Sequence, residues 1–331
     1  MKNTIYIFSN GILKRKDNTL FLELENGQKN FIPIENTKEI IVFGEVDINK
    51  RFLEFASQNE IILHFFNYYN YYCGSFYPRE HYNSGYMILK QAEFYSDIKK
   101  RLNLAKQFVF GSVENILKIL KYYNRRSKDL ANNINDINEN KNKINNIVSI
   151  NELMAIEGNI RKNYYSIFDI IINSENINFD KRTKRPPKNE INALISFGNS
   201  LVYVYCLSEI YQTHLDPRIG FLHSTNFRRF TLNLDIAEIF KPIIVDRTIF
   251  NLFNKNRIKS SDFEKYLNGL ILNDNGKKLF INEIENKLKT TIKHHTLNKE
   301  VSYRTLIRME LYKLEKHLLG ESEYFPFVMD W

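Results

Sequence analysis

Cysteine is nearly absent from this sequence of 331 residues, and its scarcity excludes several kinds of protein. Two cysteines, Cys73 and Cys206, cannot form a disulfide framework, and they cannot complete a zinc site built from cysteines alone. Each lies among apolar and aromatic residues in the sequence. We therefore interpret both as small core residues of a protein that works in a reducing cytoplasm.

Proline, glycine and long apolar runs are also scarce. Seven prolines and twelve glycines in the whole chain argue against a long disordered linker. The apolar run at residues 5–8 is too short for the core of a signal peptide, and no apolar run approaches the length of a membrane span. We therefore expect a cytoplasmic protein with no membrane partner.

Several familiar catalytic motifs are missing as well. The segment 275–278 has a Gly-Lys pair but lacks the spacing and the hydroxyl residue of a phosphate-binding P-loop. The sequence has no H-E-x-x-H, no paired C-x-x-C and no G-x-S-x-G. Nothing therefore supports a nucleophilic serine or cysteine.

The composition is that of a globular protein long enough for two domains, with 43% hydrophobic and 26% charged residues. The net charge of +9 favours an anionic partner. Charge alone leaves nucleic acid, acidic lipid and plain solubility open as explanations.

The hydrophobic pattern predicts an α+β protein with a small N-terminal β-sandwich-like domain (1–76), a connector (77–86) and a larger all-α domain (87–331). Asn26-Gly27 separates two β-rich runs and predicts a hairpin. The runs that predict strands are 4–9, 12–15, 20–24, 31–32, 39–43 and 61–66, and 48–58 predicts a helix.

Apolar residues recur at helical spacing after residue 87. The expected helices cover about 87–126, 149–172, 188–212, 233–253, 282–293 and 301–319. Ser149 and Glu152 form a capping-box pattern at the start of the second of these. Asp274-Asn275-Gly276 predicts a hairpin turn. For the Asn- and Lys-rich stretch 127–148, a polar helix, a helical hairpin and disorder all stay open.

Glu157 is the first residue that could carry chemistry. Its neighbours at helical spacing, Leu153, Ile160 and Tyr164, form an apolar stripe, so we expect its carboxylate to point toward the interior. A buried carboxylate is costly unless it binds a metal ion or pairs with another side chain, here an Arg or a Tyr inside the helical bundle, and both readings stay open. Gly158 lowers helix propensity by roughly 1 kcal/mol relative to alanine, which close packing or a site would explain.

His223, Asp235 and Glu238 are the other candidates. His223 follows Asp216-Pro217, on or just after a loop, where an isolated histidine is most often a core or surface residue. Asp235 and Glu238 stand three residues apart on one helical face, so their carboxylates repel each other unless a cation lies between them. Either a metal ion or Lys241 supplies that charge; the plain alternative is a solvated acidic turn at a helix N-terminus.

Basic residues lie close to these candidates in the sequence. The densest run, 181–188, contains Lys184 and Arg185, while Arg228 and Arg229 follow His223. Phosphate binding requires lysine and arginine beside acids that hold a metal. Most charge runs of this kind are simply solvated surfaces, and that reading stays open.

The motifs together resemble the CRISPR-associated spacer-acquisition integrase/endonuclease family, the large universal adaptation protein. The resemblance rests on segments that occur in the family's order: GSFYPRE (74–80), LMAIEG (153–158), NALISFGNS (192–200), DPRIGFLH (216–223) and LDIAEIFKPIIVDR (234–247). Each segment alone is weak, but their order is specific.

The resemblance implies a helical catalytic domain after the β domain, and a homodimer that works on double-stranded DNA with a small companion nuclease of ferredoxin-like fold. It implies a divalent metal, Mg²⁺ or Mn²⁺, held by Glu157, His223 and Glu238, with Asp235 beside them. The stretch after His223 matches a DNA-contacting region of the family. We therefore expect DNA binding by Arg228 and Arg229, and also by Lys241, Lys184 and Arg185.

The implied reaction is phosphodiester transesterification, in which the 3′-OH of a short DNA duplex attacks a phosphate of a CRISPR repeat. Two rival functions stay open at this point: a metal-dependent nuclease with no integration role, and a non-catalytic, architectural DNA-binding module. Alanine at Glu157 or His223 separates catalysis from architecture, and products joined to a target duplex separate integration from cleavage.

Overall fold

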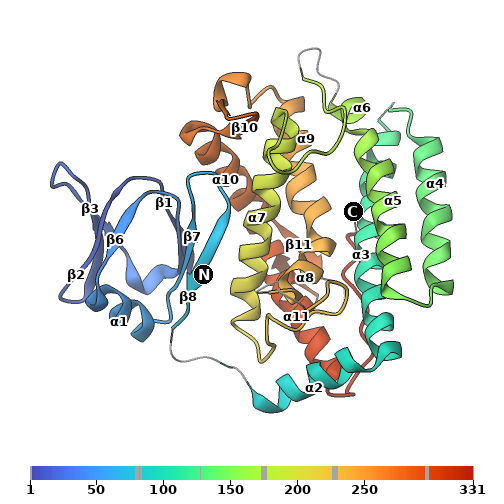
Figure 1. The fold of residues 1–331 in the computed structure, drawn as a ribbon, viewed down its shortest axis with the longest axis horizontal. Coiled ribbons are helices and arrows are strands. Elements are labelled where there is room, and N and C mark those ends of the chain that lie inside the picture. The colour runs from blue at the N-terminus through green and yellow to red at the C-terminus, as the bar shows by residue number, and fades with distance from the viewer. Residues whose placement is uncertain are drawn as a thin grey trace. The chain divides into compact units, whose positions relative to one another are not determined.

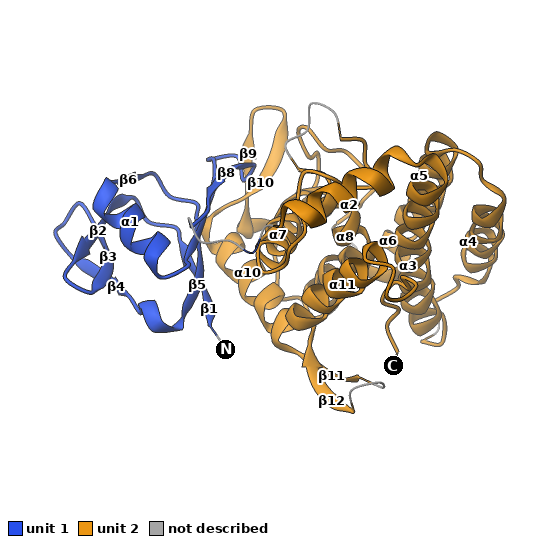
Figure 2. Cartoon of the chain, turned by 90° about the horizontal axis from the view of Figure 1, so that it is seen from below, with its two compact units in different colours: residues 1–82 blue, residues 83–331 orange. Residues whose placement is uncertain are grey.

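The computed structural model describes residues 2–78, 82, 84–126, 128–172, 177–225, 230–294 and 298–330. The chain forms two compact units, residues 1–82 and 83–331 (Figure 2). Their boundary falls inside the stretch that the sequence marks as a connector. The first unit is rich in strands and the second is mostly helical, so the predicted α+β class is confirmed.

The first unit consists of two sheets and a helix. Its elements are β1 (Asn3–Ile7), β2 (Gly11–Lys16), β3 (Thr19–Glu23), β4 (Lys29–Ile32), η1 (Ile34–Asn36), β5 (Thr37–Val42), β6 (Val46–Ile48), α1 (Lys50–Gln58), β7 (Ile62–Phe66) and β8 (Tyr72–Phe76). One sheet has the order β1-β5-β7-β8, and the other has the order β4-β3-β2-β6. β1, β5 and β7 run parallel, and β3 and β4 form the antiparallel hairpin that Asn26-Gly27 predicts.

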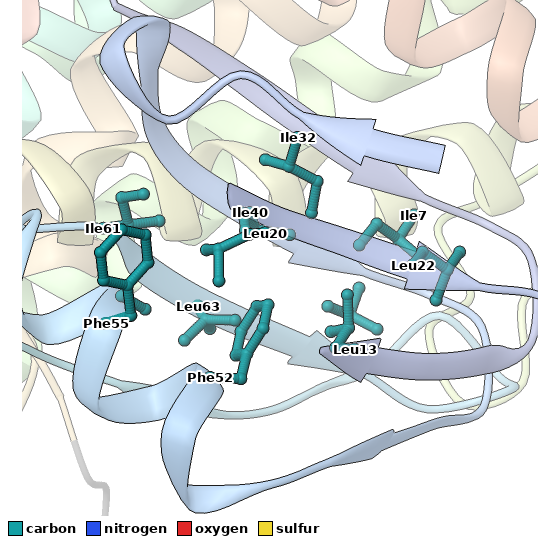
Figure 3. Packing of buried hydrophobic residues seen from close by; sticks show 12 residues of the cluster. Ile7, Leu13, Leu20, Leu22, Ile32, Ile40, Phe52, Phe55, Ile61 and Leu63 are labelled. Atoms are coloured by element: carbon teal, nitrogen blue, oxygen red, sulfur yellow. The ribbon is translucent and has the colours of Figure 1, made fainter. Parts of the chain in front are cut away.

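The core of this unit lies between the sheets and α1 (Figure 3). Alternating residues of the strands, such as Leu20 and Leu22, point inward because successive side chains of a strand face opposite ways. Asn49 caps α1 by accepting a hydrogen bond from the Phe52 backbone at 3.0 Å, which fixes the helix start and turns Phe52 and Phe55 into the core.

The second unit contains most of the helices. They are α2 (Gly85–Ser96), α3 (Ile98–Asn124), α4 (Ala131–Lys143), η2 (Ile144–Asn146), α5 (Ile150–Ser166), α6 (Phe168–Ile172), α7 (Glu190–Ile210), α8 (Leu232–Lys241), the π-helical η3 (Pro242–Asp246), α9 (Arg247–Asn254), η4 (Ser260–Asp262), α10 (Asp274–Lys289) and α11 (Tyr303–Leu318). Two antiparallel strand pairs also belong to this unit's described residues: β9 (Phe263–Tyr266) with β10 (Gly269–Leu272), and β11 (Thr291–His294) with β12 (Lys299–Ser302). The unit is therefore mostly helical but not purely so.

Helix α8 lies at the centre of this unit, packed against both α3 and α7 (Figure 1). The buried Asn115 side chain of α3 donates to the backbone carbonyl of Ile239 at 3.1 Å, which fixes how the two helices meet. Pro242 cannot donate to the carbonyl of Glu238, so α8 ends there and continues as a π-helical turn before α9.

Helix α7 corrects one expectation. By length and composition it could cross a membrane, so the statement that no apolar run approaches such a span is wrong. However, 78% of its most apolar stretch is buried inside the protein. An all-round apolar helix of this kind is typical of the interior of a large helical domain.

Other expectations are sharpened or overturned. Ser149 caps α5 as predicted, accepting from the Glu152 backbone at 3.3 Å. Residues 131–143 of the Asn-rich stretch are helical, with the isoleucines of the thin stripe buried. The hairpin turn expected at 274–276 is wrong, because Asn273 caps α10 there, accepting from the Gly276 backbone at 3.0 Å. Cys206 is buried but Cys73 is exposed, so only one cysteine is a core residue.

Candidate functional site

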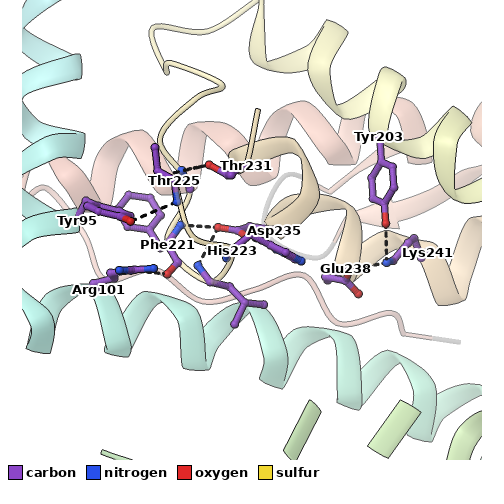
Figure 4. Close-up of polar contacts among 12 residues, drawn as sticks. Tyr95, Arg101, Tyr203, Phe221, His223, Thr225, Thr231, Asp235, Glu238 and Lys241 are labelled. Carbon is purple, nitrogen blue, oxygen red and sulfur yellow. Dashed lines mark hydrogen bonds and ion pairs between the residues drawn. The ribbon is translucent and has the colours of Figure 1, made fainter. Parts of the chain in front are cut away.

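Asp235 organises the first half of the candidate site. It lies in the first turn of α8, is fully buried, and its carboxylate accepts hydrogen bonds from three consecutive backbone N–H groups of the preceding loop (Figure 4). The Oδ2 atom accepts from Phe221 at 2.5 Å and Leu222 at 3.0 Å, and Oδ1 accepts from His223 at 3.0 Å. One aspartate therefore holds the whole loop that carries His223.

The same carboxylate also orients the His223 ring. Nδ1 of His223 lies 2.7 Å from Oδ1 of Asp235, so Nδ1 carries the proton and Nε2 of the neutral ring keeps its lone pair. Burial lowers the pKa of His223, but the hydrogen bond and the negative charge of Asp235 outweigh burial, and the net effect is a raised pKa.

Neighbouring residues restrict the loop further. A side chain at Gly220 would meet the backbone of Thr231 and Oδ2 of Asp235 at 2.7–2.8 Å, so the close approach of these segments requires glycine. Arg101 donates to the carbonyl of Phe221 at 2.9 Å. His223 is thus presented by a segment with little freedom to move.

Glu238 forms the second half of the site, one turn along α8 from Asp235. It is almost fully buried and contacts two cations, the guanidinium of Arg161 and the ammonium of Lys241. Burial raises the pKa of Glu238, but the charges of Arg161 and Lys241 outweigh burial and lower it to about 2. Lys241 also donates to the Tyr203 hydroxyl at 3.2 Å. The predicted alternative of a solvated acidic turn is wrong, because neither Asp235 nor Glu238 is solvated.

Arg161 connects Glu238 to Glu157. Its Nε donates to Oε1 of Glu157 at 2.6 Å, and its Nη2 contacts both Glu238 and the Ser112 hydroxyl, the latter at 3.2 Å. Glu157 is partly buried, with 23% of its side chain exposed. A single guanidinium therefore holds together two of the acids that the sequence singles out, one from α5 and one from α8.

The family of the chain follows from comparison with known proteins. A family model described as CRISPR associated protein Cas1 matches residues 5–286. The chain belongs to the Cas1 family.

Relatives and solved structures agree with this Cas1 assignment. The chain is 62% identical, over the full length of both proteins, to the CRISPR-associated endonuclease Cas1 2 of Thermodesulfovibrio yellowstonii. It is 53% identical to the CRISPR-associated endonuclease Cas1 of Thermotoga maritima, covering 97% of this chain and 98% of that one. The structure of a Cas1 protein from Thermotoga maritima matches with a TM-score of 0.89 and 51% identity, covering 98% of this chain and 100% of that one.

More distant structures share the fold. A casposase bound to integration product matches with a TM-score of 0.88 at 21% identity, covering 99% of this chain and 93% of the other. A chain of a Cas6-RT-Cas1–Cas2 complex matches with a TM-score of 0.85 at 17% identity, covering all of this chain and 36% of that one. At these identities the likeness concerns the fold alone.

The side chains of the Cas1 site fit a divalent metal by their chemistry. Glu157 and Glu238 offer hard carboxylate oxygens, and the bond from Nδ1 to Asp235 leaves Nε2 of His223 as a nitrogen donor. In the arrangement described, however, Arg161 and Lys241 hold the acids. Across the residues that the structure describes, no three His, Cys, Asp or Glu side chains lie close enough together to share an ion.

The basic residues predicted to bind DNA fall in different places. Lys241 is buried against Glu238 and Tyr203, whereas Lys184 and Arg185 are exposed. Partial burial and the positive charges of Arg182 and Lys241 lower the pKa of Lys184, while the charges of Glu157 and Glu238 act in the opposite direction. Lys184 therefore lies within electrostatic reach of both acids. Arg228 and Arg229 lie outside the described residues.

Arg161 is the residue whose role the sequence analysis missed. Its signal was available, because Arg161 stands four residues after Glu157, the spacing at which a glutamate and an arginine pair on a helix. Its contact with Glu238, 77 residues away, had no local signal. Close packing, one of the two explanations offered for Gly158, is wrong, because nothing lies within 4 Å of a side chain placed there.

Proposed function

We propose that this Cas1-family chain is a divalent-metal-dependent DNA endonuclease and integrase that inserts short foreign DNA segments, spacers, into a CRISPR repeat array. The observation that carries the proposal is the convergence of Glu157 and Glu238 on one guanidinium, beside His223, which is oriented by Asp235. With Asp235 included, three carboxylates lie close to two cations, Arg161 and Lys241, so the local charge favours a further cation. The relatives' name, CRISPR-associated endonuclease, supports the same class of reaction.

The proposed reaction exchanges one phosphodiester for another. The 3′-oxygen of the spacer strand attacks a phosphorus atom in the repeat, a new P–O bond forms, and the bond to the 3′-oxygen of the repeat strand breaks. The proton of the attacking hydroxyl is lost, and the leaving 3′-oxygen gains one. With water as nucleophile the same displacement is endonucleolytic cleavage.

Glu157, Glu238 and Nε2 of His223 are the groups that would hold Mg²⁺ or Mn²⁺. The ion would stabilise the negative charge that develops on the attacked phosphate and on the leaving oxygen. Asp235 keeps the Nδ1 proton on His223, so the ring presents Nε2 and cannot turn away.

In this proposal Arg161 and Lys241 neutralise Glu238 in the absence of DNA and bind phosphate oxygens in its presence. While they neutralise Glu238, its carboxylate remains buried at low cost. If the acids turn to an ion, both cations become available to the phosphate oxygens of bound DNA, to which guanidinium and ammonium groups bind strongly. The exposed Lys184 and Arg185, and a net charge of +9, support contacts with the remaining backbone phosphates.

The proposal includes the partners. One matching structure is a chain of a Cas6-RT-Cas1–Cas2 complex, which supports a small companion nuclease for this chain. We further propose a homodimer, because two 3′-ends of one duplex require two sites. A cytoplasmic location is part of the same proposal, since the substrate is cellular DNA.

A strand-joining assay tests the function. Purified protein, a short duplex with 3′-OH ends, a labelled repeat-containing duplex and Mn²⁺ or Mg²⁺ should yield branched products longer than either substrate. The matched control is the same duplex with 3′-deoxy ends, which removes the nucleophile and should abolish joining but leave cleavage. The companion protein is added in a parallel series.

Three outcomes decide between the functions. Joined products that require the 3′-OH support integration. Cleaved fragments alone, with the companion protein present, support a nuclease without an integration role. DNA binding with neither product, and no difference between wild type and His223→Ala, supports an architectural module.

A further inference from the structure

A polar pocket lies in the helical unit, at the junction of α3, α9 and α10. It has a volume of about 480 Å³ and is lined by aromatic, amide and basic side chains. This volume is within the range of roughly 300–1,000 Å³ that small-molecule sites occupy. None of its lining residues belongs to the site built around Glu238, so its function is a separate question.

Basic residues outnumber acidic residues in the lining of the pocket. Four basic residues line it: Arg126, Arg247, Lys255 and Lys287. The acid on its wall, Glu283, is engaged by Arg257 at 2.8 Å. An anion that entered the pocket would therefore meet positive charge with no acidic competitor among the described lining residues.

Lys287 is the most informative of these cations. It is half-buried, its ammonium lies 4.2 Å from the ring centre of Tyr303, and no described carboxylate pairs with it. Burial and the charge of Arg247 lower the pKa of Lys287 to about 7. Partial burial and the neighbouring arginine both disfavour the charged form of Lys287, and a bound anion would offset both effects.

The aromatic side of the pocket indicates what accompanies the anion. Tyr122 and Tyr123 meet edge to face with ring centres 5.1 Å apart, and Arg126 lies 4.4 Å from the ring centre of Tyr122. Tyrosine rings and arginine planes are the surfaces on which nucleic-acid bases stack. Amide groups that can hydrogen-bond a base edge come from Asn251 and Asn286.

We propose that this pocket binds a nucleoside carrying a phosphate monoester, with the phosphate against Lys287 and Arg247 and the base against the Tyr122–Tyr123 pair. Two sources have this chemistry: a free nucleotide and the 5′-phosphorylated end of a DNA strand. A phosphate monoester carries up to two negative charges, which matches two adjacent cations better than the single charge of a chain phosphodiester does. The proposal is independent of the metal site and of strand joining.

Calorimetry with thymidine 5′-monophosphate, thymidine, inorganic phosphate and a 5′-phosphorylated tetranucleotide tests the proposal. The monophosphate should bind with a dissociation constant on the order of 0.1 mM, and thymidine should bind at least about tenfold more weakly. Tighter binding by the tetranucleotide identifies the source as a strand end, and tighter binding by the mononucleotide identifies a free nucleotide. Either result supports the pocket.

Variants decide whether binding occurs there. Lys287→Met should weaken binding of the monophosphate at least about tenfold, whereas Lys287→Arg, which keeps the charge, should retain most of it. Arg126→Ala, at an exposed position, gives a second weakened variant that does not depend on the folding of a core change. Circular dichroism confirms that each variant is folded.

Other results overturn the proposal. Binding of the monophosphate that is unchanged in both Lys287→Met and Arg126→Ala places the ligand elsewhere. No binding of monophosphate or tetranucleotide at millimolar concentration refutes a nucleotide site. Binding of a glutamate-rich peptide in preference to both nucleotides shows that the pocket recognises acidic protein instead.

Discussion

Two buried glutamates in the helical unit have almost the same surroundings but different meanings. Glu209 of α7 accepts from Arg304 at 2.5 Å and from Arg308 at 2.7 Å, both on α11. Glu238 of α8 likewise contacts two cations, Arg161 and Lys241. A buried acid held by two bases therefore does not by itself mark a functional site.

The difference lies in what the cations contact next. The Glu209 cluster ties two helices together with one acid and two bases. At Glu238 the guanidinium reaches a second acid, Glu157, and an imidazole stands close enough that its charge affects the pKa of Glu238. A cation that is shared by two acids therefore indicates a functional site better than the burial of one acid does.

The largest expected effect is that of exchanging these two glutamates separately for glutamine. Glu238→Gln removes a proposed metal ligand, so strand joining should fall at least roughly 1000-fold, and calorimetry should show weakened Mn²⁺ binding. Glu209→Gln should leave activity per folded molecule unchanged but lower the free energy of unfolding by roughly 3 kcal/mol, because two arginines lose their charge partner. Urea denaturation measures this second effect.

Two results would contradict the different roles assigned to Glu209 and Glu238. If Glu209→Gln abolishes joining while its far-UV spectrum and urea midpoint stay as in wild type, the two clusters are functionally alike. Equal Mn²⁺ affinity in wild type and Glu238→Gln would remove Glu238 from the ligand set.

His223→Ala should reduce joining and cleavage by roughly 1000-fold with the fold intact. The fold should survive because Asp235 still accepts the three backbone N–H groups of the loop, so only the imidazole is lost. His317→Ala, on the partly exposed last turn of α11, is the control histidine. Activity close to that of wild type in His223→Ala would contradict the ligand role.

Asp235→Asn should have an intermediate effect. The amide nitrogen of asparagine would face an N–H donor where wild type has an acceptor, so the loop loosens and the ring of His223 loses its orientation. Metal affinity should fall about 10–100-fold, and amide exchange at Phe221 and Leu222 should quicken. The exposed Asp136→Asn is the control. Unchanged exchange and unchanged metal affinity would show that Asp235 does not organise the loop.

Arg161→Met removes the guanidinium that Glu157 and Glu238 share. Glu157 and Glu238 would then repel each other, and Mn²⁺ should bind about tenfold more tightly because the ion no longer competes with a charge-assisted hydrogen bond. Arg304→Met removes the corresponding cation at Glu209, which lies outside the proposed ligand set, and should add no Mn²⁺ affinity. Weaker Mn²⁺ binding in Arg161→Met would mean that the arginine positions the acids instead of occupying their place.

The sequence predicted the elements more successfully than the contacts. Alternating apolar residues and Asn26-Gly27 identified the hairpin of the first unit, and the capping pattern at Ser149 identified the start of α5. The three-residue strand β6 was missed, because so short a segment shows too little periodicity. Asp274-Asn275-Gly276 was misread because the same small polar residues favour both turns and helix starts.

The site was predictable only in part, for a physical reason. The i, i+3 spacing predicted that Asp235 and Glu238 lie on one face of a helix, but it did not predict their partners. Asp235 binds backbone N–H groups and an imidazole, whereas Glu238 binds cations from two helices. That division depends on α3, α5 and α8 meeting in space, and no local pattern encodes it. The metal ligands themselves remain a prediction, which the variants above are designed to test.

The smallest expected effect concerns Lys287, which differs from both glutamates because it is a half-buried charge with no described partner of opposite sign. Its pKa of about 7 lies below the ordinary value of 10.5. Between these pH values the unfolded chain holds a proton that the folded protein has lost, so stability rises with pH across this window, and the penalty is complete below about pH 7.

Lys287→Met removes the penalty, so its urea midpoint should exceed that of wild type at pH 6, and the difference should shrink toward pH 10. The groups that line the pocket around the ammonium are Arg247, Arg126, Lys255, the paired Glu283 and the tyrosine rings. The exposed Lys289→Met should leave the profile parallel to that of wild type. A Lys287→Met midpoint equal to or below that of wild type at pH 6 would show that the surroundings stabilise the ammonium, and this half-buried cation would then need no acid beside it.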